Sequence, residues 1–135
     1  DREGTIPILV GGTSGRALRR AATRGDGWHP ILMLPDDLRA GVERYHALCD
    51  EAGRPRGKVV YRHLAGYPPS ELTGWPFPGN AEQQATALRE YAQTGIDEIV
   101  FDATVLSEAA VDASDVVAEL ETFVSNTLPI FRDLD

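Results

Sequence analysis

The sequence predicts an α/β fold of the (β/α)₈ TIM-barrel type, made here of about four βα units in one domain, residues 1–135. Four short apolar runs recur along the chain, a helical pattern follows each of them, and 42% hydrophobic residues suffice for one core. Alternating elements of this kind form a parallel sheet with right-handed crossovers. An open, doubly wound sheet fits the same pattern. Because a complete barrel takes roughly 250 residues, four units in 135 favour a half-barrel with its strands adjacent in chain order.

The first unit begins with the apolar run 6–10, which has the composition of a strand buried on both faces. Thr13 or Ser14 then caps a helix that extends to about Arg24. Gly25 is placed to end this helix in the left-handed conformation. The inward face of the helix is expected to consist of Ala17, Leu18, Ala21 and Ala22.

The second unit has a strand within residues 27–31 that ends near His29, because the proline that follows cannot donate to a ladder. Its helix begins at about Pro35, extends to Ala52 and is terminated by Gly53.

The third unit has a strand over residues 58–64 and a loop over residues 66–80 that is rich in proline, glycine and aromatic residues, typical of a lid or packing flap. Asn80 and Gln83 form a capping box at the start of its helix, which Gly95 closes.

The fourth unit has a strand over residues 96–101, a loop to about Asp112, and a helix from about Ser114 that Pro129 kinks or ends. The face of this helix expected to point inward consists of Val116, Val117, Leu120, Phe123, Val124 and Leu128.

Composition argues against several classes of partner. Thirteen lysines and arginines against 21 aspartates and glutamates give a net charge of −8, which repels a phosphate backbone. We therefore expect no nucleic acid partner, since the helical cluster of arginines at 16, 19, 20 and 24 is too short to change this. No run approaches the roughly 18 apolar residues of a membrane helix, so we expect no membrane partner, signal peptide or anchor. The lone Cys49 fits a reducing cytoplasm.

The start of the sequence also bears on its origin. The chain opens on Asp1 and its only methionine is Met33, so we expect a trimmed or natural piece of a longer protein.

Glycines and hydroxyls meet where the first strand passes into its helix, in the order Gly11, Gly12, Thr13, Ser14, Gly15. Glycines let a backbone approach a ligand closely, and a helix start offers free N–H groups and a positive dipole end. The sequence matches neither a Walker A loop nor the dinucleotide fingerprint. It predicts either a phosphate site or an ordinary helix cap.

Trp28, His29 and Pro30 come at the carboxyl end of the second strand, where α/β sheets hold ligands. Each of them, like His63 on the third strand, is also an ordinary core residue. No set of metal ligands and no nucleophile with an adjacent base is present, so we expect no metal and assign no catalytic residue.

Several segments together resemble the luciferase-like monooxygenase family. In that family an apolar strand ends in Gly-Gly, a helix with paired alanines follows, and Gly-Asp-Gly-Trp starts the next strand. The segments that carry the resemblance are 6–14, 17–22, 25–28, 52–54, 91–100 and 128–129.

This resemblance implies a (β/α)₈ barrel that uses FMN or the deazaflavin coenzyme F-420 for monooxygenation or hydride transfer. The chain looks like strands five to eight, and we expect the parent protein to be the enzyme and this chain alone to be inactive. The positions that match coenzyme-binding residues are Gly11, Gly12, Thr13, Ser14, Trp28, His29 and Pro30.

Because open sheet edges need a partner, we expect a homo-oligomer or a complementary N-terminal half. Two alternatives remain: a non-catalytic half-barrel that dimerises, and a small α/β protein that binds a phosphate ligand.

Overall fold

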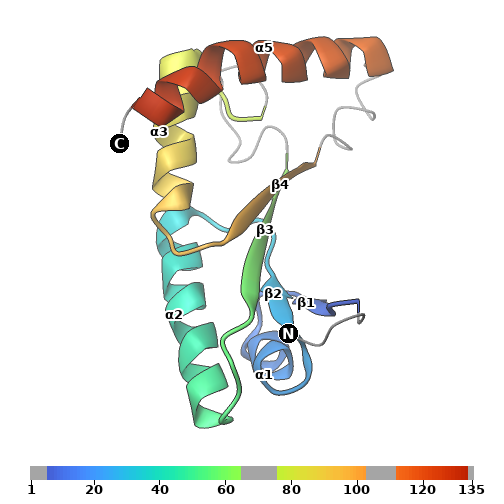
Figure 1. The fold of residues 1–135 in the computed structure, drawn as a ribbon, viewed down its shortest axis with the longest axis vertical. Coiled ribbons are helices and arrows are strands. Elements are labelled where there is room, and N and C mark those ends of the chain that lie inside the picture. The colour runs from blue at the N-terminus through green and yellow to red at the C-terminus, as the bar shows by residue number, and fades with distance from the viewer. Residues whose placement is uncertain (1–5, 65–75, 103–111, 134–135) are drawn as a thin grey trace. The chain divides into compact units, whose positions relative to one another are not determined.

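The structure, a computed structural model, describes residues 6–64, 76–102 and 112–133. Strands and helices alternate along this part of the chain (Figure 1). The strands are β1 (Leu9–Gly11), β2 (Gly27–His29), β3 (Lys58–Leu64) and β4 (Glu98–Asp102). The helices are α1 (Gly15–Arg24), α2 (Pro35–Glu51), α3 (Ala81–Ala92) and α5 (Ala113–Asp133). Most of the predicted loop 66–80 lies outside the described residues, as does most of the loop after β4.

The four strands form one sheet in the order β1-β2-β3-β4, which is also their order in the chain. β1 pairs in parallel with β2, with Val10 opposite Trp28, and β2 pairs in parallel with β3, with Trp28 opposite Val59. A doubly wound sheet reverses its order at a switch point, whereas consecutive barrel strands do not. The predicted fold class, four consecutive βα units of a barrel-type α/β fold, is confirmed.

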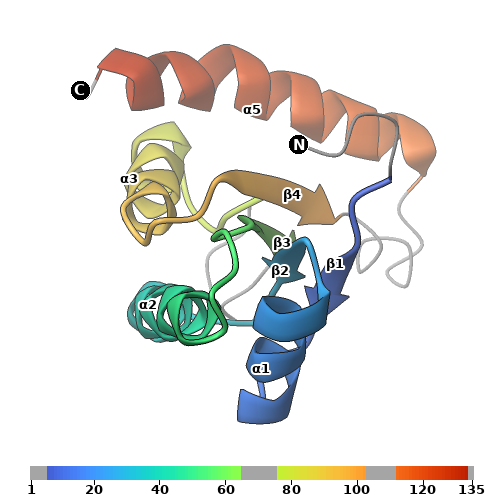
Figure 2. The ribbon, with the colours of Figure 1, turned by 60° about the horizontal axis from the view of Figure 1, so that its bottom comes forward.

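The chain divides into two compact units, residues 1–61 with 94–99 and residues 62–93 with 100–135. In the first unit α1 packs beside α2 (Figure 2). In the second unit α3 packs against α5. Nearly all buried side chains of the first unit come from α1, α2, β2 and β3, among them Ala21, Trp28, Leu38, Tyr45 and Val59.

Gly25 ends α1 as predicted, but in an extended rather than a left-handed conformation, with φ −89° and ψ 172°. A Cβ at this position would lie 2.8 Å from Cγ2 of Val10 and 3.0 Å from the carbonyl oxygen of Ala21. Close packing against β1, and not a positive φ, therefore requires glycine here.

β1 is the edge strand, and the prediction that it is buried on both faces is wrong for the described chain. Ile6 is 90% exposed, Ile8 64% and Leu9 37%. β1 has only β2 beside it, so its outer edge and much of its apolar surface face solvent.

The predicted capping box of α3 is confirmed. The amide of Gln83 donates to Oδ1 of Asn80 at 3.0 Å, and the amide of Asn80 donates to Oε1 of Gln83 at 2.9 Å. The buried hydroxyl of Thr127 on α5 donates to Oε1 of Gln84 on α3 at 2.9 Å, which joins the two helices of the second unit.

The inward face predicted for the last helix is largely wrong. Within α5 only Phe123 and Thr127 are buried, whereas Val117, Leu120 and Val124 are 53%, 42% and 48% exposed. The helix also continues through Pro129 to its end at Asp133. An apolar stripe shows what a helix is able to bury, and the described residues cover only part of it.

Among the residues that the structure describes, none of the helices has the length and apolar character needed to span a bilayer.

Candidate functional site at the start of helix α1

The turn between β1 and α1 is held in place from both sides. Gly12 has φ +101°, a conformation that side-chain-bearing residues rarely adopt. Its carbonyl oxygen accepts a hydrogen bond from the indole N–H of Trp28 at 2.8 Å. Ser14 is the N-cap of α1, since its Oγ accepts from the amide of Ala17 at 3.3 Å and its carbonyl accepts from Leu18 at 3.0 Å. The backbone of the turn is therefore fixed before any ligand binds.

The first amides of α1 are available to an anion. Thr13, Ser14 and Gly15 are exposed, and the helix geometry leaves the first N–H groups without carbonyl partners inside the helix. These groups coincide with the positive end of the helix dipole, and the first turn carries no acidic side chain. Chemically, the turn is suited to a phosphate or carboxylate group.

Trp28 positions this turn from the core. Its side chain is fully buried, and its ring lies 6.1 Å from that of Tyr45. Gly41 gives it room, because a Cβ there would lie 2.6 Å from Cη2 of the indole. The structure therefore connects Trp28 to the predicted ligand site through the carbonyl of Gly12.

His29 and Pro30 follow at the carboxyl end of β2. Nδ1 of the half-buried His29 lies 2.6 Å from the carbonyl oxygen of Val60. A carbonyl only accepts, so Nδ1 carries a proton, and Nε2 is the ring nitrogen that is left for another partner. Pro30 is fully buried. Gly11 pairs in register with His29, which brings the turn and this histidine to neighbouring strand ends.

His63 lies in the core of the second unit rather than in a ligand site. Its ring is fully buried, packs 4.2 Å from the ring of Phe77, and its Nε2–H donates to the carbonyl of Pro76 at 3.1 Å. Burial lowers the pKa of His63 to about 4, although the hydrogen bond to Pro76 acts in the opposite direction. His63 is therefore a neutral packing residue at neutral pH.

Sequence reasoning missed a strained turn just after Pro30. Leu32 is in the left-handed region with φ 55°, and its side chain is 50% exposed. The Tyr61 hydroxyl donates to the carbonyl of Met33 at 3.0 Å and accepts from the Met33 amide at 3.4 Å. No local sequence signal marks this contact, because it joins residues 28 positions apart.

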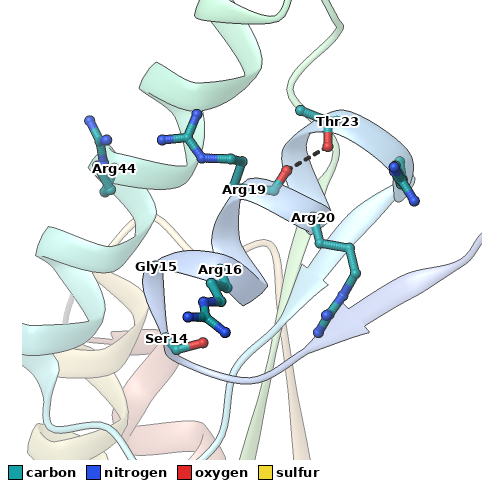
Figure 3. A pocket seen from close by; sticks show the side chains of 8 residues that line it. Ser14, Gly15, Arg16, Arg19, Arg20, Thr23 and Arg44 are labelled. Atoms are coloured by element: carbon teal, nitrogen blue, oxygen red, sulfur yellow. Dashed lines mark hydrogen bonds between the residues drawn. The ribbon is translucent and has the colours of Figure 1, made fainter.

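Ser14 and Gly15 also line an open depression of about 980 Å³, shown in Figure 3. We call it the arginine depression; its other lining residues are Arg16, Arg19, Arg20, Thr23, Arg24 and Arg44. The four arginines of α1 were visible as a helical pattern, whereas Arg44 joins them only because α2 packs beside α1.

Within the described residues, no group of three or more histidine, cysteine or carboxylate side chains is placed to hold a metal ion.

Comparison with known proteins finds a family model that matches the N-terminal part of the chain. Residues 1–66 match the family model described as luciferase-like monooxygenase, so the resemblance is confirmed over this region. The match contains the glycine turn, Trp28, His29 and Pro30.

Related sequences and a solved structure add to this. Proteins described as uncharacterized from Mycobacterium tuberculosis (strain ATCC 25618 / H37Rv) and Mycobacterium bovis are 51% identical over 49 residues, which cover 36% of this chain and 17% of each relative. An F420-dependent secondary alcohol dehydrogenase in complex with an F420-acetone adduct has a similar fold, with a TM-score of 0.58 and 14% identity. The likeness covers 73% of this chain and 43% of the dehydrogenase, and it shows the fold alone.

Proposed function

We propose that the chain, whose residues 1–66 match the luciferase-like monooxygenase model, is the C-terminal half of a barrel-type oxidoreductase and supplies the phosphate site for its flavin-type coenzyme. FMN and coenzyme F-420 both carry a phosphate group, and either would supply hydride-transfer or monooxygenase chemistry when bound. The role of this chain is to bind and orient the coenzyme, and the activity belongs to the complete barrel.

The observation that carries this proposal is the hydrogen bond from Trp28 to the carbonyl of Gly12. It holds that carbonyl toward the core, while the exposed amides that follow it belong to the start of α1. An oxyanion at the turn would thus meet N–H donors and a positive dipole end without reorganisation of the backbone. Gly12, Thr13 and Ser14 would contact the phosphate, and Gly11 would allow its close approach.

We assign to His29 a contact with the part of the coenzyme that lies beyond its phosphate. The Nδ1–H of His29 is committed to Val60, so Nε2 is the nitrogen that would contact the coenzyme at the strand end next to Gly11. The coenzyme would be FMN or F-420. The dehydrogenase of similar fold is described as F420-dependent, which makes F-420 the first to test.

The test compares each coenzyme with its phosphate-free form: FMN with riboflavin, and F-420 with its deazaflavin chromophore. Binding to the purified chain is followed by fluorescence quenching. We expect the phosphate to improve affinity at least tenfold for one of the two pairs, which corresponds to about 1.4 kcal/mol. Equal affinities within both pairs would mean that the turn is an ordinary helix cap and not a phosphate site.

A second proposal concerns association, and the exposed edge of β1 favours it. Ile6, Ile8 and Leu9 form an apolar edge with no strand beyond it in the described chain. We propose that a complementary N-terminal half or a second copy of the chain covers this edge. The alternative of a non-catalytic half-barrel that dimerises rests on the same residues. Sedimentation should show an oligomer at micromolar concentration, and a stable monomer that binds no apolar dye would contradict both.

A further inference from the structure

The arginine depression concentrates positive charge on an acidic chain. Five of the 13 basic residues line it, although the chain carries a net charge of −8. Figure 3 shows Arg16, Arg19 and Arg20 on α1 and Arg44 on the neighbouring helix α2. Among the residues that the structure describes, no carboxylate lines the depression.

Within the described residues, the arginines of α1 have no counterions of their own. No ion pair of the described chain involves Arg16, Arg19, Arg20 or Arg24, and Arg44 has only an exposed pair with Glu51 at 3.8 Å. The cationic surface is therefore open to an external anion.

This arrangement is unfavourable for the helix itself. Arg16, Arg20 and Arg24 are four residues apart, so they follow one another along one face at about 6 Å per step and repel each other. Arg16 lies in the first turn of α1, where a cation opposes the helix dipole and no acidic side chain compensates. An anion bound along this face would remove both penalties.

The dimensions of the depression favour a small ligand over a macromolecule. A volume of about 980 Å³ lies at the upper end of the range typical of small-molecule sites. Eight lining residues are far fewer than the roughly 20–30 that each partner contributes to a stable protein interface. Guanidinium groups bind phosphates and carboxylates through paired hydrogen bonds, and the hydroxyl of Ser14 adds a further donor.

We propose that the arginine depression binds a small polyanion, a molecule that carries several phosphate or carboxylate groups in a row. The site stands on the arginines and does not depend on the coenzyme proposed above. The depression shares Ser14 and Gly15 with the turn between β1 and α1. An anionic extension of a molecule bound at that turn would therefore enter the depression. A free polyanion would bind through the same groups.

Calorimetry of the complete chain at low ionic strength tests the proposal, with tripolyphosphate and tetraglutamate as probes. The variant R16E replaces the cation of the first turn by an anion, and R132Q is the control, because Arg132 is an exposed arginine on α5. We expect at least one probe to bind the natural chain and R132Q equally, and R16E at least tenfold more weakly. The probe that binds with the higher affinity then shows whether the site prefers a chain of phosphates or a chain of carboxylates.

The thermal midpoint without ligand separates a binding role from a structural one. R16E places a negative charge at the positive end of the helix dipole and allows an ion pair with Arg20. The thermal midpoint of the variant should therefore rise by a few degrees while its affinity for the probe falls. Unchanged affinity in R16E, binding of neither probe, or equal stabilisation by sulfate at matched ionic strength would overturn the proposal. Tighter binding of a short DNA duplex or an acidic protein than of both probes would also overturn it.

Discussion

The indole N–H of Trp28 donates to the carbonyl oxygen of Gly12 at 2.8 Å, across 16 residues of sequence. This bond joins the core of the first unit to the turn that begins α1. One buried aromatic residue thereby fixes the carbonyl of a glycine whose φ is +101°. The packing of the core and the geometry of the proposed phosphate site are therefore coupled.

The first prediction tests that coupling. The variant W28F keeps an aromatic ring but removes the N–H donor and part of the buried volume, so we expect the free energy of unfolding to fall by roughly 1–3 kcal/mol. Urea denaturation measures this, and coenzyme titration should show weaker binding by the folded variant. Unchanged affinity would mean that the turn keeps its shape without Trp28.

The second prediction compares two glycines of the same segment. G12A forces a Cβ into a positive φ and to 3.1 Å from Cβ of Ala17, so we expect a loss of roughly 1–3 kcal/mol. G15A meets no atom within 4 Å and starts a helix, so its stability should be equal or up to about 1 kcal/mol higher. Equal effects in denaturation experiments would contradict the described turn.

The third prediction concerns acid. The pKa of His63 falls from 6.5 to about 4 in the folded chain, so the unfolded chain binds its proton first as the pH is lowered. The part of the free energy of unfolding that depends on an uncharged His63 is fully present above pH 6.5. It declines as the pH falls from 6.5 to 4, by up to roughly 3 kcal/mol. Denaturation across this range should show a steeper decline for the natural chain than for H63F. Parallel curves would place His63 in contact with water.

The fourth prediction concerns the bond between α3 and α5. T127V removes the hydroxyl that donates to Gln84 in a buried setting, so we expect a loss of roughly 1–3 kcal/mol. T122V is the matched control, because Thr122 is exposed and its hydroxyl donates to the carbonyl of Ala118 on its own helix. The control should stay within about 0.5 kcal/mol. Similar losses in both variants would place Thr127 at the surface.

The sequence predicted those features that local chemistry determines. Asn80 and Gln83 carry a complete capping signal three residues apart, and the structure contains both of its bonds. Ser14 at the N-cap of α1 follows from the same preference. The order of the strands followed from the alternation of apolar runs and helical patterns.

Features that depend on tertiary packing could not be predicted in this way. Gly25 carries a helix-ending signal, but the nearness of Val10 decides its conformation. The apolar stripe of α5 does not show how much of it the rest of the chain covers. Arg44 joins the arginines of α1 only through the packing of two helices, which no pattern within either helix contains.

The most direct measurement of the central claim is the affinity of the chain for FMN and F-420 in the variants S14D and S14N. Aspartate and asparagine both replace the serine as good N-caps and have nearly the same shape, so both should preserve α1. They differ by one negative charge at the proposed phosphate site. If the turn holds the coenzyme phosphate, S14D loses at least tenfold in affinity while S14N stays near the natural chain; equal affinities in the two variants would contradict the claim.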